Sequence, residues 1–207
     1  MQPLSNSETA AKDIGSYKTA RILSTLFVPP TLSLFTFSYL GLHLETSFNK
    51  SVLVLGATLV LTFLLPIVFF IIMLKKKRIV NQDAEMKEER TIPFLFGLSL
   101  LLLGYLLLWF NNIHPFILAL WFSYISNMAV IILINKYWKI SIHAMGIAGP
   151  LAMFVFMGNW ISYPLLIILF LVGWSRINLK CHTFAQVIAG GFFGFLSTFL
   201  QLYLFLR

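Results

Sequence analysis

Long apolar runs separated by short polar connections set the pattern of this chain. Residues 22–44, 52–74, 92–110 and 115–134 each approach the roughly 20 apolar residues that a membrane-spanning helix needs. Only helices and closed barrels satisfy their backbone hydrogen bonds in hydrocarbon, and the strict apolar–polar alternation of a membrane barrel is absent. The expected fold class is therefore an all-α, polytopic membrane helical bundle.

Two more apolar segments extend the bundle. Residues 142–174 are too long for one crossing, and the interruption at 158–160 predicts a hairpin of two short or tilted helices, with a re-entrant loop as the alternative. Residues 183–206 form the last run. We expect six to seven transmembrane helices in one domain over residues 22–207. The preceding residues 1–21 read as a polar tail without the apolar core of a cleaved signal peptide.

Composition supports this interpretation. The 207 residues are 59% hydrophobic and 11% charged, whereas a soluble domain carries about 25% charged residues. Such a chain cannot cover a globular surface with polar groups. The single cysteine, Cys181, excludes an intramolecular disulfide.

Basic residues concentrate on one side of the expected bundle. Alternation from the N-terminus places the tail and the connections 75–91, 135–141 and 175–182 on the same side, while Lys50 and Arg207 lie on the other. By the positive-inside rule the basic side is cytoplasmic. The net charge of +8 is then a topology signal and requires no nucleic-acid partner. We expect an integral protein of a bacterial inner membrane, with its N-terminus in the cytoplasm.

Metal-binding motifs are weak. The acidic cluster 83–90 is interleaved with lysine and lacks the DxxxD helical spacing with which carboxylates hold Mg²⁺ against a diphosphate. The four histidines, at positions 43, 114, 143 and 182, show neither HxxxH nor HExxH spacing. We expect neither a metal ion nor another cofactor.

Polar side chains that could carry chemistry lie at helix ends on the predicted cytoplasmic side. They come from three separate connections, which we expect to converge on one face. Two histidines and several cations suit phosphoryl transfer without metal, because they provide a nucleophile, an acid for the leaving oxygen and partners for the nonbridging oxygens. The candidates are Lys87, Arg90, Ser141, His143, Ser175, Arg176, His182 and Gln186.

The segment SRINLKCHTFAQ, residues 175–186, resembles the third signature of the type 2 phosphatidic acid phosphatase (PAP2) superfamily, SRxxxxxHxxxD. Ser175, Arg176 and His182 match this signature in type and spacing. Gln186 stands where the signature has Asp.

Two other segments carry weaker similarity to the same superfamily. KISIHAMG, residues 139–146, is similar to the second signature, PSGH, through Ser141 and His143. In the first signature, KxxxxxxRP, Arg90 can take the Arg position, with Asp83 in place of Lys, and Lys87 could supply a second positive charge.

The resemblance implies a mechanism for the matched positions. His182 would attack phosphorus and form a phosphohistidine, and His143 would protonate the leaving group and later activate water. The carbonyl of Gln186, one helical turn after His182, could orient its imidazole without supplying the negative charge of Asp. The phosphate oxygens would be held by Arg176, Arg90, Lys87, Ser141 and Ser175.

The expected function is that of a metal-independent phosphatase acting on a lipid phosphate or pyrophosphate, with the site at the cytoplasmic face. Its partners would be this substrate and the membrane lipids. The alternative is a catalytically weak relative that binds or transports phospholipid. In that case Gln186, in place of Asp, indicates that His182 no longer acts as a nucleophile. A purely structural membrane protein would explain the hydropathy but not the converging histidines and arginines.

Overall fold

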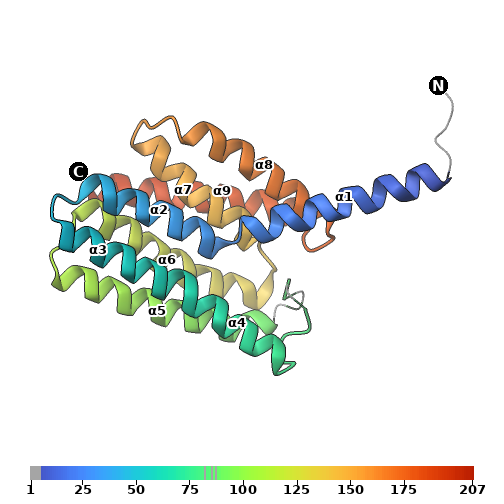
Figure 1. Cartoon of the computed structure of the whole chain (residues 1–207), viewed down its shortest axis with the longest axis horizontal. Coiled ribbons are helices and arrows are strands. Elements are labelled where there is room, and N and C mark those ends of the chain that lie inside the picture. Colours follow the sequence, from blue (N-terminus) through green and yellow to red (C-terminus); the bar gives the residue numbers. More distant parts are fainter. Residues whose placement is uncertain (1–5, 82, 85, 87) are drawn as a thin grey trace.

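The computed structural model describes residues 6–81, 83, 84, 86 and 88–207. Within these residues every regular element is a helix and no strand occurs, which confirms the all-α fold class. Most helices lie lengthwise beside one another, and the first projects beyond the end of the others (Figure 1).

The elements follow the apolar pattern closely. η1 is a single π-helical stretch between α3 and α4, and η2 is a 3₁₀ turn that leads into α5. In chain order they are α1 (Asn6–Leu26), α2 (Pro29–Leu44), α3 (Phe48–Ala57), η1 (Thr58–Leu64), α4 (Leu65–Lys75), η2 (Glu88–Arg90), α5 (Thr91–Phe110), α6 (Pro115–Tyr137), α7 (Ile142–Phe156), α8 (Ser162–Asn178) and α9 (Phe184–Phe205).

Several helices are compatible with a membrane protein. Four described segments are long and apolar enough to cross a bilayer, and α1 with α2 makes a fifth if this bent pair is one span. The four segments enclose or closely match the predicted runs 52–74, 92–110, 115–134 and 183–206. They are Phe48–Lys75, Glu88–Phe110, Pro115–Tyr137 and Phe184–Phe205.

The predicted first span, 22–44, is broken. α1 ends at Leu26, α2 begins at Pro29, and the two axes differ by 45°. Prolines at 29 and 30 have no backbone N–H to donate, and they drive the preceding Val28 into an extended conformation with ψ of 152°. α1 also begins at Asn6, so the described part of the expected polar tail is helical and continuous with the first apolar residues.

The segment 142–174 forms the expected hairpin. α7 and α8 are joined by a turn in which Gly158 has φ of +63°, a left-handed conformation that glycine adopts without steric cost. With 15 and 17 residues, the two helices are shorter than the roughly 20 residues of a full crossing. By length, the described helices therefore support four to five crossings.

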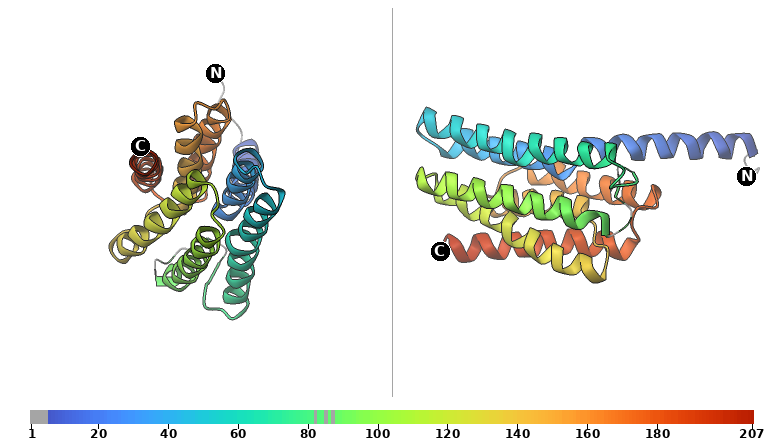
Figure 2. Two further views of the ribbon diagram at one scale, coloured as in Figure 1. Left: turned by 90° about the vertical axis from the view of Figure 1, so that its left-hand side faces the viewer. Right: turned by 90° about the horizontal axis from the view of Figure 1, so that it is seen from below.

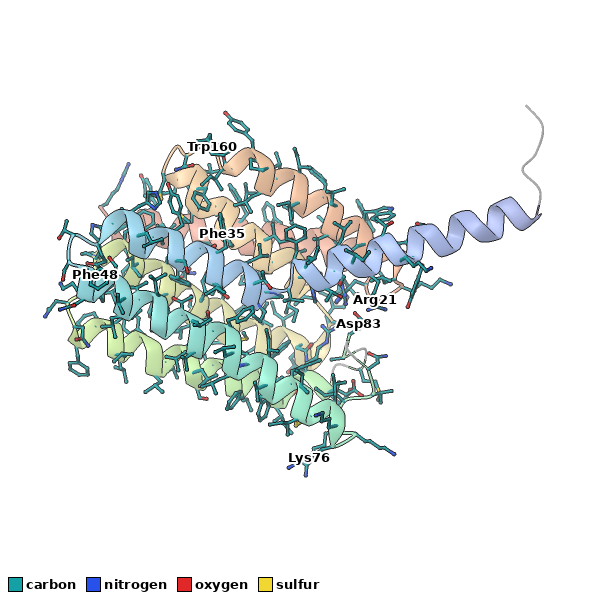
Figure 3. All side chains as sticks on the ribbon, in the orientation of Figure 1. Arg21, Phe35, Phe48, Lys76, Asp83 and Trp160 are labelled. Carbon is teal, nitrogen blue, oxygen red and sulfur yellow. The ribbon has the colours of Figure 1, made fainter. Side chains whose placement is uncertain are left out.

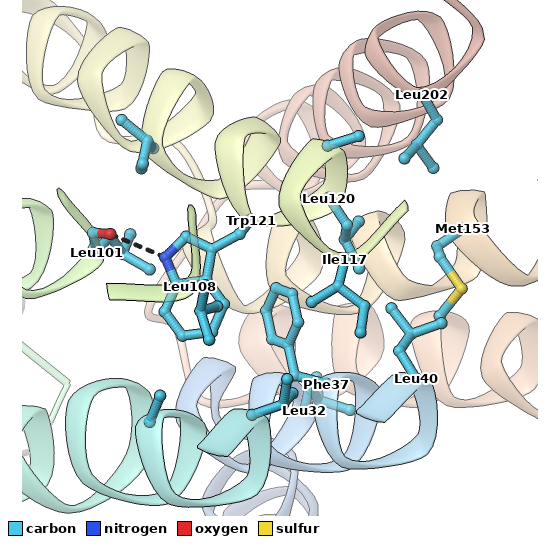
Figure 4. Packing of buried hydrophobic residues seen from close by; sticks show 14 of the residues in the cluster. Leu32, Phe37, Leu40, Leu101, Leu108, Ile117, Leu120, Trp121, Met153 and Leu202 are labelled. Atoms are coloured by element: carbon cyan, nitrogen blue, oxygen red, sulfur yellow. Dashed lines mark hydrogen bonds between the residues drawn. The ribbon is translucent and has the colours of Figure 1, made fainter. Parts of the chain in front are cut away.

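Aromatic and aliphatic side chains from several helices form the core (Figure 4). Trp121 of α6 is fully buried, and its ring centroid lies 4.6 Å from that of Phe37 in α2. The indole N–H donates to the carbonyl of Leu101 in α5 at 2.8 Å, so the one polar atom of this side chain is satisfied. Trp121 thereby ties α5 and α6 to α2.

α9 packs tightly on α7 through small residues. A methyl group on Gly194 would lie 2.8 Å from the carbonyl oxygen of Met145, and Gly190 lies directly against the backbone of Ser141. This approach places the start of α9 beside the start of α7. The end-on view in Figure 2 shows α9 on the opposite side of the bundle from α2, α3 and α4.

A polar network joins α6 to α9 within the apolar region. The Asn127 amide donates to Thr198 Oγ1 at 3.2 Å, and its oxygen accepts from Ser197 at 2.6 Å. Gln201 donates to Ser197 and accepts from Ser126 at 2.6 Å. Side-chain hydrogen bonds of this kind hold helices together where hydrocarbon provides no hydrophobic driving force.

We expect Asn127→Ala to lower the free energy of unfolding by about 1–3 kcal/mol, because it leaves Ser197 and Thr198 without their shared partner. Thermal unfolding in detergent measures the change. The control is Asn111→Ala, which removes an exposed amide that donates to Leu107 of its own helix. Equal melting temperatures for the two variants would contradict a stabilising network.

Candidate functional site

The three polar connections singled out in the sequence meet at one end of the bundle (Figure 1). Arg90, before α5, donates to the carbonyl of Ile140 at 3.4 Å. Lys139, before α7, donates to the carbonyl of Cys181 at 2.8 Å. Arg176, at the end of α8, binds Asp83 of the α4–α5 connection at 2.7 Å. Each pair of connections is therefore bridged by a basic side chain.

An ion-pair chain links α1 to α8 through Asp83. One carboxylate oxygen of Asp83 accepts from Arg21 at 2.6 Å and the other from Arg176 at 2.7 Å. Figure 3 shows Arg21 and Asp83 beside each other at the base of the projecting α1. Burial alone raises the pKa of Asp83, but the hydrogen bonds from Arg21 and Arg176 outweigh it and lower this pKa to about 2. Asp83 is thus a carboxylate at all physiological pH values.

Arg176 is the most constrained cation of the site. Its side chain is 1% exposed, and its Nη1 also donates to Ser24 Oγ at 2.6 Å. Arg21 and Ser24 both belong to α1, so the first helix helps to hold the arginine of the third signature. The Nε of Arg176 is buried and has no hydrogen-bond partner among the described residues.

Arg90 is buried as well, and its guanidinium contacts backbone. Nε donates to the carbonyl of Ala84 at 2.8 Å, and the two Nη atoms lie 3.4 Å from the carbonyls of Ile140 and Asp83. These bonds hold the α4–α5 connection against the start of α7. Arg90 therefore has a structural role in addition to the charge it brings to the site.

A cavity of about 600 Å³ opens onto these cations. Its volume falls within the range of about 300–1,000 Å³ that is typical of small-molecule sites. Its walls are mainly apolar and come from α2, η1, α4, α5 and α6. One end is polar and is lined by Arg21, Ser24, Asp83, Arg90, His143 and Arg176. The cavity thus has the shape of a site for an amphiphile with an anionic end.

His143 lies at this polar end, in the first turn of α7. Its Nδ1 is buried and has no hydrogen-bond partner among the described residues. His182, Asp83, Arg90 and Arg176 are all close enough to His143 to act on it electrostatically. The helix N-terminus adds partial positive charge at the same place.

His182 is oriented by Gln186, as the spacing predicts. The ring Nδ1 lies 3.1 Å from Gln186 Oε1, and since this oxygen can only accept, Nδ1 carries the proton and Nε2 the lone pair. Burial, followed by the charges of Arg90, Arg176 and Lys139, lowers the pKa of His182 to about 3. The imidazole is therefore neutral at pH 7, with an unprotonated Nε2 that is buried and unpartnered among the described residues.

Gln186 also has a local structural role. Its Oε1 accepts from the Thr183 backbone N–H at 3.1 Å, and Thr183 Oγ1 accepts from the Gln186 N–H, which together form a capping box at the start of α9. Neither His182 nor Gln186 lines the cavity. They lie behind its polar end, on the α9 side.

Three buried nitrogens without described partners thus belong to one cluster: Arg176 Nε, His143 Nδ1 and His182 Nε2. They come from α8, α7 and the connection before α9. Because a buried polar group normally finds a hydrogen-bond partner, the Nε–H of Arg176 indicates a ligand with an acceptor oxygen, whereas the lone pair on His182 Nε2 is suited to a donor or an electrophile. A phosphate group provides both acceptor oxygens and an electrophilic phosphorus.

The remaining predicted site residues lie elsewhere. Ser141 Oγ caps α7 by accepting from the Ala144 N–H, and Ser175 Oγ donates to Val172 within α8, so the structure brings neither hydroxyl to the cavity. Lys87 lies outside the described residues. Among the described residues, no group of three His, Cys, Asp or Glu side chains is arranged to hold a metal ion.

Asp83, Arg21 and Ser24 are site residues to which the sequence pattern assigns no role. Each is separated by at least 62 positions from its partner in the ion-pair chain, and no local motif marks such a pairing. The available signal is weak: Asp83 is the first acid of the 83–90 cluster, in the connection that also carries Arg90.

The comparisons with known proteins place this chain in no family. No family model matches it, and searches of curated proteins and of solved structures return no significant match.

Proposed function

We propose that this protein is an integral-membrane, metal-independent phosphatase that removes phosphate from a lipid phosphate or pyrophosphate. The observation that carries the proposal is the pair of unpartnered nitrogens on Arg176 and His143 at the polar end of an apolar cavity, with the unpartnered Nε2 of His182 outside the cavity lining. The lipid tail lies between α2, α4 and α5, and its phosphate meets the cations. This reading also explains the resemblance to the PAP2 signatures.

The arrangement supports a two-step reaction. A phosphate dianion that binds beside Arg90, Arg176 and His143 draws a proton from solution onto the neutral His143 imidazole. The Nε2 lone pair of His182 then attacks phosphorus, the bond from phosphorus to the lipid oxygen breaks, and His143 gives this proton to the departing oxygen. Neutral His143 next takes a proton from water, whose oxygen attacks phosphorus as the P–N bond breaks. Inorganic phosphate leaves, His143 releases its proton, and both histidines return to their neutral starting states. Arg176 and Arg90 stabilise the charge on the phosphoryl oxygens throughout.

In this proposal α7 and α8 are counted with the longer helices, giving six to seven membrane segments. The excess of Lys and Arg at the site end supports a cytoplasmic location for the site and the N-terminus, by the positive-inside rule.

A second candidate is phospholipid binding or transport without hydrolysis. It is favoured by one observation: His182 does not line the cavity, although Arg176 and His143 do. In that case phosphate would bind at the same cations but never meet the nucleophile.

Phosphate release from a single-chain alkyl phosphate by purified protein in nanodiscs tests the proposal. We expect release by the wild type to be insensitive to chelator and to fall at least about 10³-fold in His182→Ala, because the covalent step is lost. The matched control is His43→Ala. The His43 ring stacks on Tyr39 and its Nδ1 donates to the Tyr39 carbonyl, at the other end of α2 from the site. Release that is equal in wild type and His182→Ala would refute hydrolysis by His182. Binding without release would support the second candidate.

A further inference from the structure

Arg21 and Arg176 already bind an anion that belongs to the protein itself, the carboxylate of Asp83. The Asp83 side chain is 6% exposed and places one oxygen on Arg21 and the other on Arg176. Carboxylates and phosphates form the same short, charge-assisted bonds with guanidinium groups. Asp83 therefore occupies donors that the proposed function assigns to a phosphate.

Asp83 is the one acidic residue among the described residues that line the cavity. The neighbouring acids are placed differently. Glu88 is exposed, and Glu89 Oε1 accepts from the Val80 backbone N–H at 3.1 Å. The position of a carboxylate on Arg176 is thus specific to Asp83 and not a general property of the acidic connection.

We propose that Asp83 is a specificity-determining residue: an internal anion that a ligand must displace from Arg176, and that therefore selects phosphomonoesters over phosphodiesters. This inference rests on the proposed function only in that the site binds a lipid phosphate. A monoester carries about −1.5 to −2 charges at pH 7, whereas a diester carries one. A diester only matches the charge of the carboxylate it replaces, but a monoester exceeds it.

The environment makes this competition effective. Arg176 is buried, so attraction to its guanidinium and repulsion between two anions beside it are both weakly screened. The bulk phospholipids that surround a membrane protein are diesters and vastly outnumber a monoester substrate. Selection by charge would keep their headgroups out of the site while leaving it open to the substrate.

The test compares binding of dodecyl phosphate and methyl dodecyl phosphate, a monoester and a diester with the same chain, to full-length protein in phosphatidylcholine nanodiscs. We expect the wild type to prefer the monoester, and Asp83→Asn to bind the diester at least about tenfold more tightly while gaining less for the monoester. The matched control Glu88→Gln removes the same charge from the same connection, and we expect it to keep the wild-type preference. A preference that is unchanged in Asp83→Asn, or weaker binding of both ligands, would overturn the proposal.

A second measurement needs no variant. Carbodiimide labelling of carboxyl groups in the wild type, read by mass spectrometry, reports whether Asp83 is held by the arginines. We expect saturating dodecyl phosphate to increase labelling of Asp83 and to leave that of Glu88 unchanged. If Asp83 stays protected while the ligand is bound, displacement does not occur and the inference fails.

These outcomes separate the inference from the proposed function. Selective binding without phosphate release would retain the role of Asp83 and remove hydrolysis. Hydrolysis with no change in selectivity on Asp83→Asn would retain the proposed function and remove the role of Asp83. If neither ligand binds wild type or Asp83→Asn, both the inference and the proposed phosphate site are wrong.

Discussion

Replacing Arg176 with glutamine is expected to lower kcat/KM for phosphate release by about 10³-fold or more. Arg176 combines a fully buried guanidinium, an unpartnered Nε and a place at the polar end of the cavity. A preorganised donor aimed at developing phosphoryl charge contributes about 10²–10³ in rate, and loss of the positive charge adds to this. Steady-state kinetics on the purified variant measure the effect.

The same change has a structural consequence that must be separated from catalysis. Asp83 would keep only Arg21, and breaking a buried ion pair commonly costs about 3–5 kcal/mol. Arg176→Lys retains the charge near Asp83 but loses the planar fork, so we expect it to recover stability more than rate. Arg78→Gln, at an exposed arginine of the α4–α5 connection, is the control. Near-normal kcat/KM in a folded Arg176→Gln protein would exclude Arg176 from phosphate binding.

Replacing Gln186 with glutamate is expected to raise kcat by about tenfold or more, with little change in KM. The variant keeps the length of the side chain and its oxygen near His182 Nδ1, and adds a negative charge that stabilises the positive phosphohistidine. In a serine protease the loss of an orienting carboxylate lowers turnover by about 10⁴, which sets the upper scale. Burst and steady-state rates of phosphate release distinguish formation of the intermediate from its hydrolysis.

The partner variant Gln186→Met removes the acceptor at nearly constant length. We expect kcat to fall, because His182 loses the bond that fixes its tautomer, and α9 to become less stable, because Thr183 loses its capping partner. If glutamate and methionine change kcat in the same direction, the role of Gln186 is limited to capping α9.

Much of the fold could be predicted because apolar length and helix-breaking residues act locally. The four long apolar segments and the hairpin around Gly158 agree with the structure. The predicted first span, 22–44, is divided into α1 and α2 by a break for which Pro29 and Pro30 carry the signal, and the bent pair is long and apolar enough to form one span. The expected six to seven crossings are not confirmed: by length the described helices support four to five, because α7 and α8 are short enough to be either spans or buried helices.

The candidate site was predictable where residues stand at a short fixed spacing or at helix ends on the same side of the bundle. His182 and Gln186 are four positions apart and do bond, and His143 and Arg176 do share one end of the bundle. Roles for Ser141 and Ser175 could not be judged from spacing, because their hydroxyls satisfy backbone groups of their own helices. Asp83 was unpredictable for a different reason: its partners are set by tertiary packing of α1 and α8 around one connection.

The link between Ser24 and Arg176 has a consequence for biosynthesis. The two residues are 152 positions apart, and ribosomes add about 5–20 residues per second. About 8–30 s therefore pass between the synthesis of Ser24, near the end of α1, and the synthesis of Arg176, which binds it. Arg21 gains its partner sooner, because Asp83 follows it by only 62 positions, or about 3–12 s at the same rate. The contact that holds the end of α1 against α8 can thus form only after α8 has been synthesised.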